Sequence, residues 1–325
     1  MRKIVVPGID IKIPVLGFGC SALTGVTRTD ASKVLRNAFD AGVRHFDVAR
    51  YYGYGEAEQI LGAFVKGRRA EITIATKFGI QPPSRMSPLR LAVQAGRRLV
   101  RLVPPIRTFM QSRAKVFTRR GAFSVTDAQK SLEMSLRALG TDFIDFYLLH
   151  DYIAEEHPAE DLVRSLEGFV ESGKVRYFGI GTSIDNVLRA LEYQPKLCRV
   201  VQFENSVLTR NVGRLPPTVV DRLVITHGSL STSYASIVSF LETHADKVRD
   251  WSAKLGVDCS NDDTVAALML NFAIEMNPNG LVVFSSMNPT RVTKNTKAVL
   301  QSTFSAAQIS LFGDLVEQDA TQRNR

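Results

Sequence analysis

The sequence has few cysteines, and none of them fits a disulfide or metal-binding pattern. Its 325 residues contain only three, Cys20, Cys198 and Cys259, which are odd in number and far apart. A disulfide framework needs pairs, and a structural zinc site needs cysteines or histidines at close, regular spacings. We therefore expect free thiols, no bound metal, and a reducing, cytoplasmic location.

Long apolar runs are also missing. No stretch reaches the roughly 20 apolar residues that a membrane-spanning helix requires. The opening MRKIVVPGIDIKIPV has an apolar run too short for a signal peptide, with Asp10 and Lys12 close behind it. We expect neither a secretory signal nor a transmembrane segment.

Acidic residues are absent between Glu71 and Asp127, whereas ten basic residues lie between Arg85 and Arg120. Because the chain has 41 basic and 32 acidic residues, setting these ten aside leaves 31 basic ones and a net charge of −1. The formal charge of +9 therefore belongs to one segment. The rest is near neutral and the segment lacks interleaved aromatic residues, so we expect no nucleic-acid partner.

Strand-like and helix-like segments alternate along the chain. Eight short and nearly continuous apolar runs are VLGFG, GVRHFD, ITIATK, FIDFYLL, VRYFGI, RVVQF, RLVIT and GLVVF. Such runs are typical of parallel strands covered on both faces, and helical stripes over residues 30–42 and 162–173 lie between them. With no linker between them, these segments predict a single (β/α)8 TIM barrel over residues 1–325, preceded by a β-hairpin in KIVV and IKIP.

Three details of this barrel can be predicted further. Thr126 and Gln129 have the spacing of a capping box ahead of the helix that ends at Gly140. Residues 234–255 predict one extra helix before the helix at 264–276. After the sixth strand, Pro216 and Pro217 leave room for only a short helix or none.

A long basic insertion over residues 80–126 follows the third strand. Within it, PLRLAVQAGRRLVRLV places apolar residues on one side of a helix and arginines on the other. Such a helix is compatible with a lid over the substrate, a funnel for anionic substrates, a membrane-surface helix or a partner site, and equally with a solvated face.

Four residues with acid–base chemistry lie at strand ends or just beyond them. Asp47 closes GVRHFD, Lys77 closes ITIATK, His150 closes FIDFYLLH, and Tyr52 follows Asp47 by five residues. The active site of such a barrel lies at the C-terminal ends of its strands. A carbonyl that receives a hydride needs a proton, which a tyrosine can supply if a nearby ammonium lowers its pKa. Lys77 would supply that charge, Asp47 would pair with Lys77, and His150 would donate to the carbonyl.

The sequence around these residues resembles the aldo-keto reductase family. FDVARYYGYGEAEQILG is similar to the family's FDTA-x-x-YG-x-G-x-SE-x-x-LG, and ATKFG, DFYLLHD and GKVRYFGIG match three later strands in order. The resemblance implies catalysis by Asp47, Tyr52, Lys77 and His150. Singly, Asp47 could cap a helix and the tyrosines could be packing residues, but the four matches together favour catalysis. We expect His45 and His157 to be structural.

The resemblance also implies a cofactor, NADP(H). No GxGxxG motif follows a strand, so the sequence does not support a Rossmann site for it. The nicotinamide would lie across the barrel mouth, near Gly19 and Cys20. The family's Ser-Asn pair is replaced by Gly181 and Thr182, so Thr182 or Ser183 would hold the carboxamide together with Gln202. His227 occupies the place of the stacking aromatic residue. The remaining matches, in SSMNPTRVTKN, are Ser286, Arg291 and Asn295.

These last three residues would bind the adenosine 2′-phosphate. Lys294 replaces a commonly acidic residue and is expected to add positive charge, which favours NADP over NAD. We therefore predict an NADP-dependent oxidoreductase acting on an aldehyde, ketone or sugar. The alternative is a non-catalytic NADPH-binding sensor on the same barrel. The substrate and the oligomeric state stay open.

Overall fold

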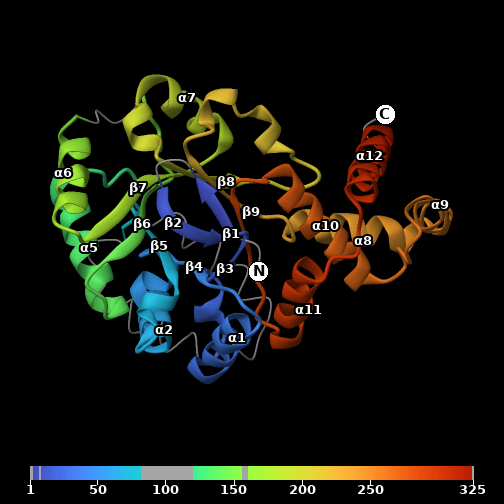
Figure 1. The fold of residues 1–325 in the computed structure, drawn as a ribbon, viewed down its shortest axis with the longest axis horizontal. Coiled ribbons are helices and arrows are strands. Elements are labelled where there is room, and N and C mark those ends of the chain that lie inside the picture. The colour runs from blue at the N-terminus through green and yellow to red at the C-terminus, as the bar shows by residue number, and fades with distance from the viewer. Residues whose placement is uncertain (1–2, 7–8, 82–119, 156–159, 324–325) are drawn as a thin grey trace.

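The computed structural model describes residues 3–6, 9–81, 120–155 and 160–323. Eight parallel strands close into a barrel in the order β10-β3-β4-β5-β6-β7-β8-β9, with helices around it (Figure 1). The strands are β3 (Leu16–Gly19), β4 (His45–Asp47), β5 (Thr73–Phe78), β6 (Ile144–His150), β7 (Val175–Gly181), β8 (Val200–Glu204), β9 (Leu223–His227) and β10 (Leu281–Phe284). The predicted barrel is confirmed, and each predicted apolar run overlaps one of its strands, although β5 to β9 each extend one residue past the run.

The helices cover the outside of the barrel with their apolar faces. In α1, Ala31, Val34, Leu35 and Ala38 are all buried, and the Thr27 hydroxyl accepts from the Asp30 amide at its start. The helices are α1 (Arg28–Asp40), α2 (Glu56–Val65), α5 (Val125–Leu139), α6 (Glu160–Glu171), α7 (Ile184–Tyr193), α8 (Thr232–Thr243), α9 (Ala245–Leu255), α10 (Asp262–Met276), α11 (Pro289–Leu300) and α12 (Ala306–Arg323).

The predicted N-terminal hairpin is present. Strands β1 (Lys3–Val6) and β2 (Ile9–Pro14) pair antiparallel. Only Val15 separates β2 from β3, and its carbonyl accepts from the Val282 amide at 2.9 Å. The hairpin therefore joins the barrel at the N-terminal ends of the strands, away from the predicted site.

Two of the predicted details are wrong. The cap of α5 is Ser124, whose hydroxyl accepts from the Asp127 amide at 3.1 Å, so Thr126 and Gln129 lie inside the helix. The single helix predicted over 234–255 is two helices, because His244 leaves the helical region with φ −130° and ψ 77°. The stretch after the sixth strand contains only two 3-10 turns, Asn211–Arg214 and Pro217–Val219, as Pro216 and Pro217 predict.

The extra helices build a second apolar core beside the barrel. Helices α8 and α9 lie with α10 and α12 to one side of it in Figure 1. Trp251 is buried there and donates to Asp319 at 3.0 Å, while Lys247 donates to the other oxygen of Asp319 at 2.6 Å. These bonds join α9 to α12.

The strand register brings the predicted catalytic residues together. Asp47 pairs with Gly19 on one side and with Ala75 on the other, and His150 pairs with Gly181, which in turn pairs with Gln202. Because all the strands are parallel, their C-terminal ends form one rim.

The basic insertion starts and ends at this rim. The Gly79 carbonyl accepts from the Ala122 amide at 3.1 Å, which brings the two ends of the segment together. Residues 82–119, and with them the predicted amphipathic helix, lie outside the described residues. Within the described residues, no helix is long and apolar enough to cross a membrane.

Candidate active site

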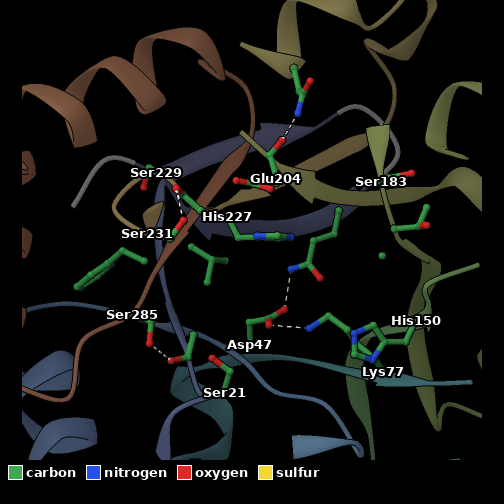
Figure 2. Close-up of a pocket in the computed structure, with 18 of the residues that line it drawn as sticks. Ser21, Asp47, Lys77, His150, Ser183, Glu204, His227, Ser229, Ser231 and Ser285 are labelled. Atoms are coloured by element: carbon green, nitrogen blue, oxygen red, sulfur yellow. Dashed lines mark hydrogen bonds and ion pairs between the residues drawn. The ribbon is translucent and has the colours of Figure 1, made fainter. Parts of the chain in front are cut away.

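A cleft of about 710 Å³ opens at the C-terminal ends of the strands, and all eight barrel strands contribute to its lining. Asp47, Tyr52, Lys77 and His150 all line it, as Figure 2 shows for the three that it labels. The structure thus gathers the four predicted catalytic residues in one place. Among the described residues, no group of three or more histidine, cysteine or acidic side chains is placed to hold a metal ion.

Asp47 is the centre of the polar network. Its Oδ1 accepts from Lys77 Nζ at 2.6 Å, and its Oδ2 accepts from Gln202 Nε2 at 2.7 Å (Figure 2). Lys77 also donates to the Val48 carbonyl at 3.2 Å. The Asp47 and Lys77 side chains are both buried, so the ion pair is held away from water.

Burial and pairing oppose each other in this ion pair. Burial acts to raise the pKa of Asp47, but the charge of Lys77 and the bonds from Lys77 and Gln202 hold that pKa below its ordinary value. Burial acts to lower the pKa of Lys77, and Asp47 and Tyr52 together keep it above its ordinary value. Both groups therefore stay charged at neutral pH.

Tyr52 lies beside Lys77, with the ammonium 5.6 Å from the centre of the phenol ring. Burial raises the pKa of Tyr52 and Lys77 acts to lower it, with a net result above the ordinary value. Lys77 thus acts in the predicted direction, but the predicted net lowering is wrong because burial outweighs it. A phenol that stays protonated at neutral pH is suited to giving up a proton to an oxygen that gains charge.

His150 stands edge-on to Tyr52, with the ring centres 6.2 Å apart. Burial, followed by the charge of Lys77, lowers the pKa of His150 to about 3. The imidazole is therefore neutral at physiological pH, and it can donate a hydrogen bond without competing as an acid. Its Nδ1 has no hydrogen-bond partner in the described part of the chain.

Most of the residues predicted to hold nicotinamide line the same cleft. Gly19, Thr182, Ser183, Gln202 and His227 all do so. Thr182 accepts from the Asn186 side chain at 3.1 Å and Ser183 from the Asn186 amide at 3.3 Å, so both hydroxyl hydrogens remain available for donation.

Cys20 does not reach the cleft surface. Its side chain is fully buried, and its backbone amide donates to the Asp47 carbonyl at 2.8 Å. Burial, followed by the charge of Asp47, raises the pKa of the Cys20 thiol well above its ordinary value. Cys20 can therefore contribute packing beneath the site, but its thiol makes no surface of the cleft.

The predicted 2′-phosphate residues lie on or just before α11, outside the cleft lining. The Ser286 hydroxyl accepts from the Asn288 amide at 3.2 Å, and Arg291 has an exposed side chain. Lys294 forms an ion pair with Asp263 of α10. Asp263 therefore offsets the positive charge that Lys294 is expected to add, and Arg291 is left as the main candidate for a phosphate.

Several polar residues of the cleft were not predicted from the sequence. Asp151 and Glu204 bring carboxylates to it, and Ser229, Ser231 and Thr232 bring hydroxyls. Each lies at a strand end or within five residues beyond one, so position alone could have marked them. The buried Ser229 hydroxyl has no hydrogen-bond partner within the described ranges, which fits a cleft that receives a polar ligand.

Comparison with known proteins identifies the family. The profile of the aldo/keto reductase family matches residues 15–317. The chain belongs to this family, and the resemblance in the sequence is confirmed. It is 31% identical over 209 residues to the aldo-keto reductase yakc [NADP(+)] of Schizosaccharomyces pombe, covering 62% of this chain and 52% of that protein.

A second relative is the D-threo-aldose 1-dehydrogenase of a Pseudomonas species, 31% identical over 193 residues, or 55% of this chain and 53% of that protein. The chain thus spans about half the length of these curated relatives.

Solved structures share the fold at low sequence identity. An aldo-keto reductase of Bacillus halodurans in its holo form has a TM-score of 0.73 at 20% identity, covering 97% of this chain and 96% of that one. An aldo-keto reductase of Klebsiella pneumoniae in complex with NADPH has a TM-score of 0.70 at 21% identity, with coverage of 97% and 95%. At such low sequence identities, the structural similarity supports the shared barrel fold alone.

Proposed function

We propose that this protein is an NADP-dependent oxidoreductase that transfers a hydride between nicotinamide and an aldehyde, ketone or sugar, with Tyr52 as general acid and base. The observation that carries the proposal is the buried Asp47–Lys77 pair beside Tyr52 and His150 at the floor of one cleft. Membership of the family and the NADP(+) in the name of the yakc relative support the cofactor.

The residues of the cleft fit such a cofactor. Thr182, Ser183 and Gln202 would hold the carboxamide, His227 would stack on the ring, and Ser229 would offer its unpaired hydroxyl. When bound, the cofactor supplies or accepts the hydride. The residues of this chain position the carbonyl group and provide the proton.

In reduction, His150 donates a hydrogen bond to the carbonyl oxygen and orients it. Tyr52 then gives its phenolic proton to that oxygen as negative charge develops there. The Lys77 ammonium stabilises the phenolate left behind, and Asp47 keeps Lys77 charged and in place. In oxidation the same phenolate takes the proton from the alcohol.

The test is NADPH oxidation, followed by absorbance, against a panel of aldehydes, ketones and sugars. We expect turnover with at least one carbonyl class and loss of that turnover in Tyr52→Phe. Sugars belong in the panel because Asp151 and Glu204 line the cleft and can accept from substrate hydroxyls. Tight NADPH binding with no turnover across the panel would favour the second candidate, a non-catalytic NADPH sensor.

One feature of the cleft is compatible with the non-catalytic sensor. The family's serine at the end of the fifth strand is Gly181 here, so the carboxamide loses one hydroxyl donor. The intact set of Asp47, Tyr52, Lys77 and His150 favours the enzyme, because a sensor has no need of a proton donor.

A further inference from the structure

The turn that carries Tyr52 has an unusual backbone. Tyr52 opens the 3-10 turn Tyr52–Gly55, and the three residues after it have positive φ angles: 60° at Gly53, 56° at Tyr54 and 95° at Gly55. A non-glycine residue in the left-handed region is held there at a cost of about 1 kcal/mol or more, so the surroundings must impose the conformation.

Arg50 fills the inside of this turn. A Cβ atom added to Gly55 would lie 2.1 Å from Arg50 Nη1 and 2.6 Å from its Cζ, so the guanidinium packs directly on the Gly55 backbone. The Arg50 amide also donates to the Lys77 carbonyl at 3.3 Å, which extends the β4–β5 pairing past Asp47. Arg50 thus contacts both the turn of Tyr52 and the strand of Lys77.

Glu58 completes the connection. Its Oε2 accepts from Arg50 Nη1 at 2.8 Å, and its Oε1 accepts from the Thr76 hydroxyl at 2.8 Å. The Glu58 carboxylate is fully buried on α2, and Thr76 is the residue before Lys77. One chain of charged and polar bonds therefore runs from the Tyr52 turn to the strand that presents the ammonium.

We propose that Arg50, Glu58 and Thr76 are positioning residues that fix the separation of Tyr52 from Lys77. None of the three is among the residues that line the cleft, so they act only through the turn and the strand. The role rests on the proposed function, because it concerns the placement of its proton donor. Misplacement of a reacting group by about 1 Å can lower a rate roughly a hundred-fold.

A second ion pair in the barrel provides a matched control. Arg69 pairs with Asp145 at 2.7 Å, with side chains 16% and 0% exposed, while Arg50 pairs with Glu58 at 2.8 Å, with side chains 18% and 0% exposed. Asp145 is the second residue of β6, at the end of the barrel opposite the cleft. The two pairs match in their nitrogen–oxygen distance and in the burial of their side chains, but only the Arg50–Glu58 pair lies beside the turn of Tyr52.

The experiment compares Arg50→Ala with Arg69→Ala. Both should lower the free energy of unfolding in urea, because each removes a cation from a buried carboxylate. The loss should be smaller for Arg69→Ala, because Asp145 keeps a second cation, Arg176, at 3.1 Å. Only Arg50→Ala should lower kcat, by roughly ten- to a hundred-fold, with the Kd for NADPH unchanged. Added methylguanidinium should restore part of the kcat of Arg50→Ala, because Arg50 is partly exposed, and an equal concentration of ammonium should not.

Two further measurements keep the outcome clear if Arg50→Ala does not fold. Thr76→Val removes one bond of the connection without changing any charge, and it should also lower kcat. In protein labelled with ¹³C-tyrosine, with the Tyr52 resonance assigned from Tyr52→Phe, Arg50→Ala and Thr76→Val should shift and broaden that resonance. Arg69→Ala should leave it in place.

An unmoved Tyr52 resonance and an unchanged kcat in Arg50→Ala and Thr76→Val would overturn the positioning role. The same holds if Arg69→Ala lowers kcat as much as Arg50→Ala does. Wild-type protein with no turnover of any carbonyl would contradict the proposed function instead, and the tyrosine resonance would still report whether the three residues hold Tyr52.

Discussion

Gln202 donates to the oxygen of Asp47 that Lys77 does not use. The carboxylate is therefore shared between a cation and an amide, and both of its oxygens accept hydrogen bonds that favour the charged form. The Gln202 amide nitrogen is engaged with Asp47, and its oxygen faces Gly181, where an added Cβ would lie 3.2 Å from it. That oxygen can accept from the carboxamide of a nicotinamide, so Gln202 connects the proposed proton relay with the proposed cofactor site.

Tyr52→Phe should abolish hydride transfer and leave NADPH affinity nearly unchanged. The phenol acts on the oxygen of the substrate in the transition state, and the cofactor would be held by other residues. Steady-state turnover and a fluorescence titration with NADPH measure the two effects. Tyr51→Phe is the control, and wild-type turnover in Tyr52→Phe would remove Tyr52 from the proposed role.

Asp47→Asn should destabilise the protein and inactivate it. Lys77 would be left buried with no counter-charge, and breaking such a pair costs about 3–5 kcal/mol. Urea unfolding measures the loss. Asp161→Asn, which breaks an exposed pair with Arg164, should leave the free energy of unfolding nearly unchanged, because water screens that pair. Equal losses in the free energy of unfolding for the two substitutions would show that the buried Asp47–Lys77 pair stabilises the protein no more than an exposed pair does.

NADPH should bind more tightly than NADH, and Arg291→Ala should remove most of the difference. A charge-assisted contact with the 2′-phosphate is worth about 1.5–3 kcal/mol, or roughly ten- to a hundred-fold in affinity. Lys294→Ala should have a smaller effect, because Lys294 already pairs with Asp263. Titrations that give equal affinities for both cofactors in the wild type would refute this assignment.

His45 should make the stability of the barrel depend on pH. Burial lowers the pKa of this fully buried imidazole to about 4, while the unfolded chain binds the proton near pH 6.5. Its full contribution is therefore present above about pH 6.5, and about 3 kcal/mol is lost as the pH falls toward 4.

Urea unfolding at several pH values checks this prediction. His45→Asn, which cannot titrate there, should flatten the profile between about pH 4 and 6.5. His244→Asn is the control, because that side chain lies at the surface between α8 and α9. A profile of His45→Asn that parallels the wild type would contradict it.

The barrel could be predicted because its strands are buried on both faces and its helices on one, and burial leaves a pattern in the sequence. The four catalytic candidates could be predicted because Asp47, Lys77 and His150 lie at or next to the ends of such strands and Tyr52 follows Asp47 at the family's spacing. The cap at Ser124 could not, since Thr126 and Gln129 show an equally plausible spacing. The raised pKa of Tyr52 depends on burial, and the pairing of Lys294 depends on Asp263 of another helix, so neither was visible in the chain order.

The segment from about Pro82 to Phe123 should help to select the substrate. The bond between Gly79 and Ala122 lies at the catalytic face and brings the chain before this segment close to its last residues, and Arg120 pairs at 3.0 Å with Asp151, which lines the cleft. Replacing residues 82–119 with a short glycine-serine linker tests this, because the ends are close enough for such a linker to span. We expect changed KM values and a changed preference across the carbonyl panel, with NADPH affinity preserved.

Arg120→Ala in the full chain removes only the ion pair with Asp151, so it separates the effect of that pair on substrate preference from the effect of the segment. An unchanged substrate profile in the shortened protein, together with lost binding to anionic vesicles or to a partner protein, would instead assign the basic segment to docking.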